Sequence, residues 1–148
     1  MRFAACFIAI LPLLFLGVTA CSKPKPPVGK WEGGYESGGT LVVARVEILP
    51  SGQVKVMAPD ITNLTGPQIA GYRARLAADL ANGWSDIEPR DFEFDGKTFR
   101  KPGGYAPQMV WDKDSNHLTL QLYIGANPAL PVPLRPVDDF HDNPWASG

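Results

Sequence analysis

The stretch Thr40-Leu41-Val42-Val43-Ala44-Arg45-Val46-Glu47-Ile48-Leu49 has the clearest periodicity in this chain of 148 residues. Every second residue from Val42 to Ile48 is apolar, and charged side chains stand at two of the positions between them. A period of two residues is typical of a β-strand with one buried face. Leu41 and Val43 add apolar side chains to the second face, so we expect the first half of this strand to be covered on both sides.

Seven further stretches have the length or the alternation of short strands, and glycine, proline or aspartate turns separate them. They cover residues 30–36, 54–58, 92–94, 98–101, 109–111, 118–124 and 132–134. Asp95-Gly96 is typical of a tight hairpin turn. Pro131 and Pro133 deny hydrogen bonds to one side of the last strand, which we therefore expect to be an edge strand or a closing strand.

The period of the apolar residues changes between the predicted strands at residues 54–58 and 92–94. Ile69, Tyr72, Leu76 and Leu80 follow one another at steps of three and four residues, which places them on one face of a helix. Asn82-Gly83 then supplies a stop signal. The pattern predicts one amphipathic helix over about residues 66–82.

The predicted fold is mainly β, with about eight antiparallel strands and one inserted helix in a single domain over residues 29–137. Two arrangements satisfy this pattern: a small β-barrel with the helix capping one end, or a strongly curled open sheet with the helix on one face. Closure favours the barrel, because a closed sheet has no exposed edges.

Residues 1–20 have the layout of an export signal. Arg2 supplies a positive charge, an uncharged apolar run extends from Phe3 to Val18, and small residues precede Cys21. An uncleaved membrane anchor needs about 20 apolar residues, and this run is shorter. An ordinary signal peptide cut after Ala20 also fits, but it leaves an unpaired cysteine at the start of an exported chain.

The sequence Val18-Thr19-Ala20-Cys21 resembles the lipobox of bacterial lipoproteins. The resemblance implies that the signal peptide 1–20 is removed, that lipid is attached to Cys21, and that this lipid holds the chain at a membrane of the cell envelope. Ser22 is not acidic, which in proteins of this type implies the outer membrane, with the domain facing the periplasm.

Removal of residues 1–20 leaves 128 residues, which is the size of one domain. Since Cys21 is the one cysteine that remains, a hydrophobic core must hold the fold without a disulfide. Arg2 is the one charged residue of the removed segment, so the formal net charge changes from −1 to about −2. With no cluster of lysine and arginine, we expect no nucleic-acid partner.

Two polar segments flank the predicted domain. Residues 21–28 contain three prolines and two lysines, which predicts an extended tether of about 20 Å. Residues 138–148 begin with three aspartates and His141, which a metal ion could use. A complete site needs further ligands from elsewhere, and we therefore expect a flexible acidic tail.

Catalysis and metal binding find little support in the sequence. His117 falls in a predicted turn, His141 falls in the tail, and no serine stands in a Gly-x-Ser-x-Gly motif. Residues 112–116 resemble the start of a calcium-binding loop, but His117 and Tyr123 occupy the places of the required glycine and carboxylate. We expect no enzyme, no cofactor and no metal.

Gly29-Lys30-Trp31 is similar to the Gly-x-Trp motif of lipocalins, and Arg135 is the arginine placed near the last strand. The resemblance implies an eight-stranded barrel in which Trp31 packs at the closed end against Arg135. It also implies an interior that takes a small apolar ligand or a lipid. The hypothesis that Trp31 stacks on Arg135 corresponds to a contact of about 0.5–2 kcal/mol.

Tyr105 and Trp145 lie in glycine- or proline-rich surroundings that are difficult to bury, so we expect them to line a binding surface. Trp111 is the third candidate ligand-binding residue. The stretch 95–99, followed by Gly104-Tyr105 and Trp111, resembles small lipoproteins that inhibit lysozyme, although their cysteine pair is missing. The predicted function is therefore non-catalytic binding of a small apolar ligand or lipid. The alternative is binding of an envelope protein, such as a hydrolase or an assembly factor.

A cavity of at least about 300 Å³ favours the small ligand. A filled interior with Tyr105 exposed favours the protein partner.

Overall fold

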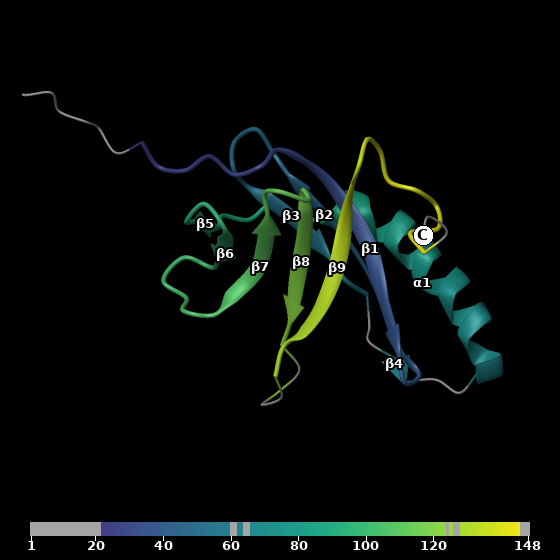
Figure 1. The fold of residues 1–148 in the computed structure, drawn as a ribbon. Coiled ribbons are helices and arrows are strands. Elements are labelled where there is room, and N and C mark those ends of the chain that lie inside the picture. The colour runs from purple at the N-terminus through teal and green to yellow at the C-terminus, as the bar shows by residue number, and fades with distance from the viewer. Residues whose placement is uncertain (1–21, 60–61, 64–65, 124, 126–127, 146–148) are drawn as a thin grey trace, which may run out of the picture.

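The computed structural model describes residues 22–59, 62–63, 66–123, 125 and 128–145. In this part of the chain, nine strands pair into one antiparallel sheet and one α-helix lies outside it (Figure 1). The strands are β1 (Gly29–Ser37), β2 (Thr40–Ile48), β3 (Val54–Met57), β4 (Thr62–Asn63), β5 (Glu93–Phe94), β6 (Thr98–Arg100), β7 (Pro107–Asp112), β8 (His117–Leu122) and β9 (Leu130–Val137).

The strands follow the order β3-β2-β1-β9-β8-β7-β6-β5, and the short β4 pairs with the other end of β2. The prediction of a mainly β fold with eight principal strands and one inserted helix is confirmed. The sheet is curled into a half-barrel rather than closed, so the second of the two predicted arrangements is the one observed (Figure 1).

Strand β9 pairs with β8 on one side and with β1 on the other. It therefore joins the C-terminal strands to the N-terminal strands, as the closing-strand prediction required; the edge-strand alternative is wrong. Pro131 and Pro133 lie opposite β8, whereas the pairing with β1 involves only residues 135–137 of β9. The prolines thus lie beyond the short ladder with β1, where an amide hydrogen is not needed.

The two faces of the sheet bury separate apolar clusters. The inner face of β2, from Val42 to Ile48, belongs to the main core, as the alternation predicted. Leu41 and Val43 point to the outer face, where they pack against the helix. The expectation that this half of β2 is covered on both sides is therefore confirmed.

The helix α1 (Ile69–Gly83) is extended by a 3-10 turn at each end, η1 (Gly66–Gln68) and η2 (Trp84–Asp86). Leu76 and Leu80 bury its apolar stripe on the outer face of β2, with Tyr72 packed beside them. Helix α1 thus covers the convex side of the sheet and does not cap one end. Of the residues that the structure describes, none belongs to a helix long and apolar enough to cross a membrane.

Trp31 is buried in the core, only 2% exposed, and its indole Nε1 donates a hydrogen bond to the carbonyl oxygen of Asn116 at 3.2 Å. In the pairing of β1 with β9, Trp31 faces Pro136 and the next residue, Glu32, faces Arg135. Because successive side chains of a strand point to opposite faces, Trp31 and Arg135 lie on opposite sides of the sheet. The predicted stacking of Trp31 on Arg135 is wrong.

Arg135 instead belongs to a polar cluster on the outer face, built around the fully buried Glu32. Arg135 lies 3.6 Å from the Glu32 carboxylate, and Arg45 is the residue paired with Glu32 on β2. The backbone N–H of His141 donates to Glu32 at 2.9 Å, and the His141 imidazole contacts the same carboxylate. Arg45 in turn donates to the carbonyl oxygen of His141 at 2.7 Å.

Residues 138–145 are therefore not a free acidic tail, as we had expected, but a segment packed on the sheet; we call them the C-terminal strap. Lys30 forms an ion pair with Asp139 at 2.7 Å, and the Phe140 ring lies under the Arg45 guanidinium at 5.0 Å. Trp84, at the end of α1, makes an edge contact with Phe140. The strap was missed because its polar partners on β1 and β2 lie 96 to 109 residues earlier in the chain.

Residues 22–28 form neither helix nor strand, in line with the predicted tether, but they contact the domain. A Cβ placed on Gly96, in the β5–β6 turn, would lie 3.6 Å from Pro24, and one placed on Gly52, after β2, would lie 3.7 Å from Pro26. The tether thus runs across two turns at one end of the curled sheet (Figure 1). Cys21 and the signal segment 1–20 lie outside the described residues.

Candidate functional site

Strands β3 and β5 are the two ends of the strand order in the described part of the sheet. We call the open side between them the seam, and the candidate site lies there. In an up-and-down barrel these two strands would pair, but the chain enters α1 and its flanking turns after β3 and β4, on the outside of the sheet. Both strands are short, with four and two residues. The described residues join the two sides of the seam through one β-bridge, in which Val54 and Arg90 exchange two backbone hydrogen bonds of 2.9 Å.

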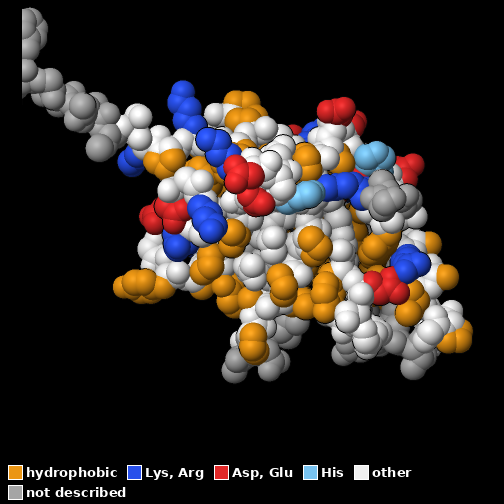
Figure 2. All heavy atoms as spheres, in the orientation of Figure 1, with side chains coloured by type: hydrophobic (Ala, Val, Ile, Leu, Met, Phe, Trp, Pro, Cys, Tyr) orange, Lys and Arg blue, Asp and Glu red, His pale blue; other side chains and the backbone are white. Residues whose placement is uncertain are grey.

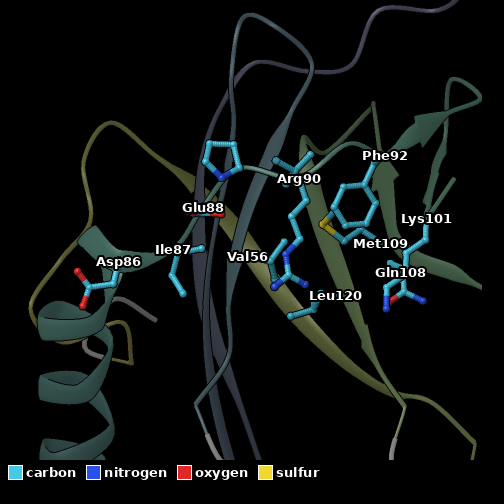
Figure 3. Close-up of a pocket in the computed structure, with 12 residues that line it drawn as sticks. Val56, Asp86, Ile87, Glu88, Arg90, Phe92, Lys101, Gln108, Met109 and Leu120 are labelled. Atoms are coloured by element: carbon cyan, nitrogen blue, oxygen red, sulfur yellow. The ribbon is translucent and has the colours of Figure 1, made fainter.

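Beside this bridge a cleft of about 460 Å³ opens into the interior of the curled sheet. Apolar side chains from β3, from the segment before β5, and from β7 and β8 form its floor, and they come from four separate parts of the chain (Figure 3). They are Val54, Val56, Phe92, Met109 and Leu120. The volume lies within the range of small-molecule sites, about 300–1,000 Å³.

Polar side chains border the cleft. Arg90 extends from the bridge so that its guanidinium lies near Val56 and Leu120, while Lys101 and Gln108 stand on the opposite side (Figure 3). Asp86 and Glu88, from the segment that follows α1, also border the cleft. The site therefore combines an apolar floor with a few charged groups at its margin, which is the usual composition of a ligand pocket.

The outer polar cluster offers a second concave region, of about 360 Å³, between Gly33-Gly34 and the strap. Its carboxylate, Glu32, is already engaged by Arg135 and His141. A Cβ on Gly34 would lie 2.3 Å from the indole nitrogen of Trp145, and one on Gly33 would lie 2.4 Å from the carbonyl oxygen of Pro133. These close approaches indicate that the region serves to pack the strap against β1 and β9.

The structure places the aromatic residues that we selected from the sequence outside the seam cleft. Tyr105 lies in the loop between β6 and β7, and its side chain is 98% exposed. Trp111 is half-buried, and its indole Nε1 donates to the side-chain oxygen of Asn116 at 3.1 Å. Trp145 packs with the outer cluster around Leu41. Tyr105 is thus accessible to a partner, whereas Trp111 and Trp145 have packing roles of their own.

Both histidines lie on the outer face of the sheet: His117 lines the outer concave region together with Glu32 and Arg135, and His141 contacts Glu32. His117 begins β8, next to the tight turn in which Ser115 and the Asp114 amide donate to Asp112, and His141 lies in the strap. Among the described residues no three His, Cys, Asp or Glu side chains gather in a way that could hold a metal ion. The predicted absence of an enzyme activity, a cofactor and a metal stays a prediction.

Blue and red side chains alternate on the face seen in Figure 2, and apolar side chains gather along its lower edge. No single sign of charge dominates this face. Comparison with protein-family models, with curated proteins and with solved structures finds no match for this chain.

Sequence reasoning missed the seam cleft because its residues share no periodic pattern. One signal was present: a helix inserted into an otherwise consecutive run of strands separates the two strands on either side of it. Strands separated in this way cannot form a tight hairpin, so the place of the helix in the sequence marked the place of the seam.

Proposed function

We propose that this protein is a non-catalytic binding module of the bacterial cell envelope that holds a small molecule with an apolar body in the seam cleft. The observation that carries the proposal is the cleft itself, about 460 Å³ in volume, with an apolar floor and charged groups at its margin. A cavity of at least about 300 Å³ favours a small ligand over a protein partner, and the volume of this cleft is larger than that.

The proposed cellular location follows from features of the N-terminal sequence. The charged start, the apolar run and the lipobox-like Val18-Thr19-Ala20-Cys21 support export, removal of residues 1–20 and lipid attachment at Cys21. More than one acyl chain is needed for stable anchoring, and the lipid on such a cysteine provides this. Ser22 favours the outer membrane, with the domain facing the periplasm.

Native mass spectrometry tests the binding function. Residues 22–148, which contain every strand of the sheet and both apolar clusters, are exported to the bacterial periplasm without the lipid signal and purified without detergent. We expect an extra mass of a few hundred daltons that is lost on denaturation. A bare monomer mass, also after incubation with a total lipid extract, would contradict the proposal.

A protein partner is the second candidate, and the exposure of Tyr105 is the observation that favours it. An aromatic side chain that is 98% exposed on a loop is typical of an anchor residue for a protein interface. Crosslinking in the envelope through a photoreactive residue at position 105 tests this candidate. Capture of one defined envelope protein, lost when the photoreactive residue is moved to Lys113, would support it.

A further inference from the structure

Arg90 differs from the other arginines that the structure describes. Arg73, Arg75, Arg100 and Arg135 form ion pairs with Glu36, Asp79, Asp95 and Glu32, and Arg45 donates to the carbonyl oxygen of His141. Among the described residues, the guanidinium of Arg90 has no such partner, although Asp86 and Glu88 border the same cleft. Asp86 lies beside the helix, whereas Arg90 extends toward β3 and β8 (Figure 3).

The backbone holds Arg90 in this position. Its N–H and C=O are both bonded to Val54 at 2.9 Å, so the residue cannot move away from the seam without breaking the bridge that joins its two sides. Its side chain is directed between Val56 and Leu120, over the apolar floor (Figure 3). Arg90 is exposed to solvent at the margin of the cleft, so its guanidinium is accessible to an anionic group of a bound ligand.

We propose that the ligand of the seam cleft is an amphiphile: an alkyl chain with one anionic head group. The chain lies on the floor formed by Val56, Phe92 and Met109, and the head group accepts hydrogen bonds from the Arg90 guanidinium. Planar guanidinium groups bind carboxylate and phosphate oxygens in pairs. Lys101, on the opposite side of the cleft, adds a second positive charge. This inference rests on the proposed function and names its ligand class.

Matched ten-carbon probes test the proposal by isothermal titration calorimetry on residues 22–148. Decanoate carries a carboxylate, decyl phosphate carries a phosphate, and decanol is uncharged. The variant Arg90→Gln removes the charge but keeps the backbone bridge, and its urea unfolding curve reports whether the fold is retained. Arg75→Gln is the matched control, because this arginine lies on the exposed side of α1, with its side chain 68% exposed.

We expect at least one anionic probe to bind about tenfold or more tightly than decanol, and Arg90→Gln to remove that difference while Arg75→Gln leaves it unchanged. Preference for decanoate would indicate a free fatty acid, and preference for decyl phosphate would indicate a lipid with a phosphate head. Equal binding of all three probes, unaffected by Arg90→Gln, would overturn the anionic head group but leave the proposed function intact. Binding of no probe would contradict both.

Discussion

A buried carboxylate defines this fold at the scale of single residues. Glu32 is fully buried on the outer face of β1, beside Arg135 and opposite Arg45, and it also accepts the backbone N–H of His141. Burial lowers the pKa of Arg45, and the charge of Glu32 opposes that effect. A charge removed from water is costly unless it is paired and hydrogen-bonded, so each member of the cluster depends on the others.

Glu32→Gln leaves Arg45 and Arg135 without their anion in a buried position. We expect a loss of about 3–5 kcal/mol in the free energy of unfolding, the usual effect of breaking a buried ion pair from one side. Urea denaturation measures it. The control is Glu36→Gln, which removes an ion pair with Arg73 near the surface and is expected to cost less than about 1 kcal/mol. Equal effects of the two variants would contradict the role of the Glu32 cluster.

Asp95 holds the β5–β6 turn by accepting four hydrogen bonds. The Thr98 hydroxyl and amide donate at 2.5 and 2.7 Å, the Arg100 guanidinium at 2.6 Å and the Lys97 amide at 2.9 Å. These donors, the Thr98 hydroxyl foremost, hold the pKa of Asp95 well below its ordinary value of 3.8. Such a group stabilises the folded state above its unfolded-state pKa and loses this effect as the pH falls toward its folded-state value.

The variant Asp95→Asn tests this effect. At about pH 7 we expect its urea midpoint to be lower than that of the wild type, and the difference to shrink steadily as the pH falls below about 3.8. The comparison is repeated at about pH 2, with Asp114→Asn, in an exposed turn, as the control. A difference that stays constant with pH would show that the Asp95 charge is not involved.

At the scale of elements, two adjacent glycines allow β1 to carry the strap. Gly33 lets the backbone of β9 approach, and Gly34 leaves room for the indole of Trp145. In the sequence, this pair interrupts the strand pattern predicted for residues 30–36. The structure supplies the reason, because a side chain at either position would meet backbone or indole atoms at less than 2.5 Å.

The variant Gly34→Ala is expected to displace Trp145 and lower the urea midpoint, because its Cβ would also lie 2.8 Å from the carbonyl oxygen of Val42. The matched control is Gly71→Ala on α1, where a Cβ meets open space and alanine is the better helix former. We expect the control to be more stable by about 0.4–1 kcal/mol. A neutral Gly34→Ala would mean that the strap does not depend on this contact.

On the scale of the whole molecule, the half-barrel is stabilised on its convex side by α1 and the strap, while its concave side opens at the seam. The apolar cluster with Leu76 and Leu80 and the polar cluster around Glu32 lie on the same outer face. Deleting residues 138–148 exposes Glu32 and removes two of its hydrogen-bond contacts and the Phe140 ring.

The deletion is expected to lower the urea midpoint clearly while leaving the β-sheet circular dichroism spectrum in place, because none of the described strap residues belongs to the inner core. Asp138→Ala, at an exposed position at the start of the strap, serves as the control and should change little. An unchanged urea midpoint after the deletion would contradict a stabilising role for the strap.

The sequence by itself determined the elements and their faces. Alternation in residues 40–48 predicted both the buried inner face and the doubly covered start of β2, and the spacing of Tyr72, Leu76 and Leu80 predicted the stripe of α1. These are local properties, because the period of a strand or a helix and the hydrophobicity of its residues decide which side chains turn inward.

Only the tertiary structure decided what these elements enclose. The register of β9 against β1 placed Arg135 beside Glu32 rather than Trp31, and the position of α1 outside the sheet left the seam open. The cleft with Arg90 and the strap over Glu32 join residues from distant parts of the chain. Such contacts depend on strand register and on the curl of the sheet, and a one-residue shift in register turns every side chain to the other face.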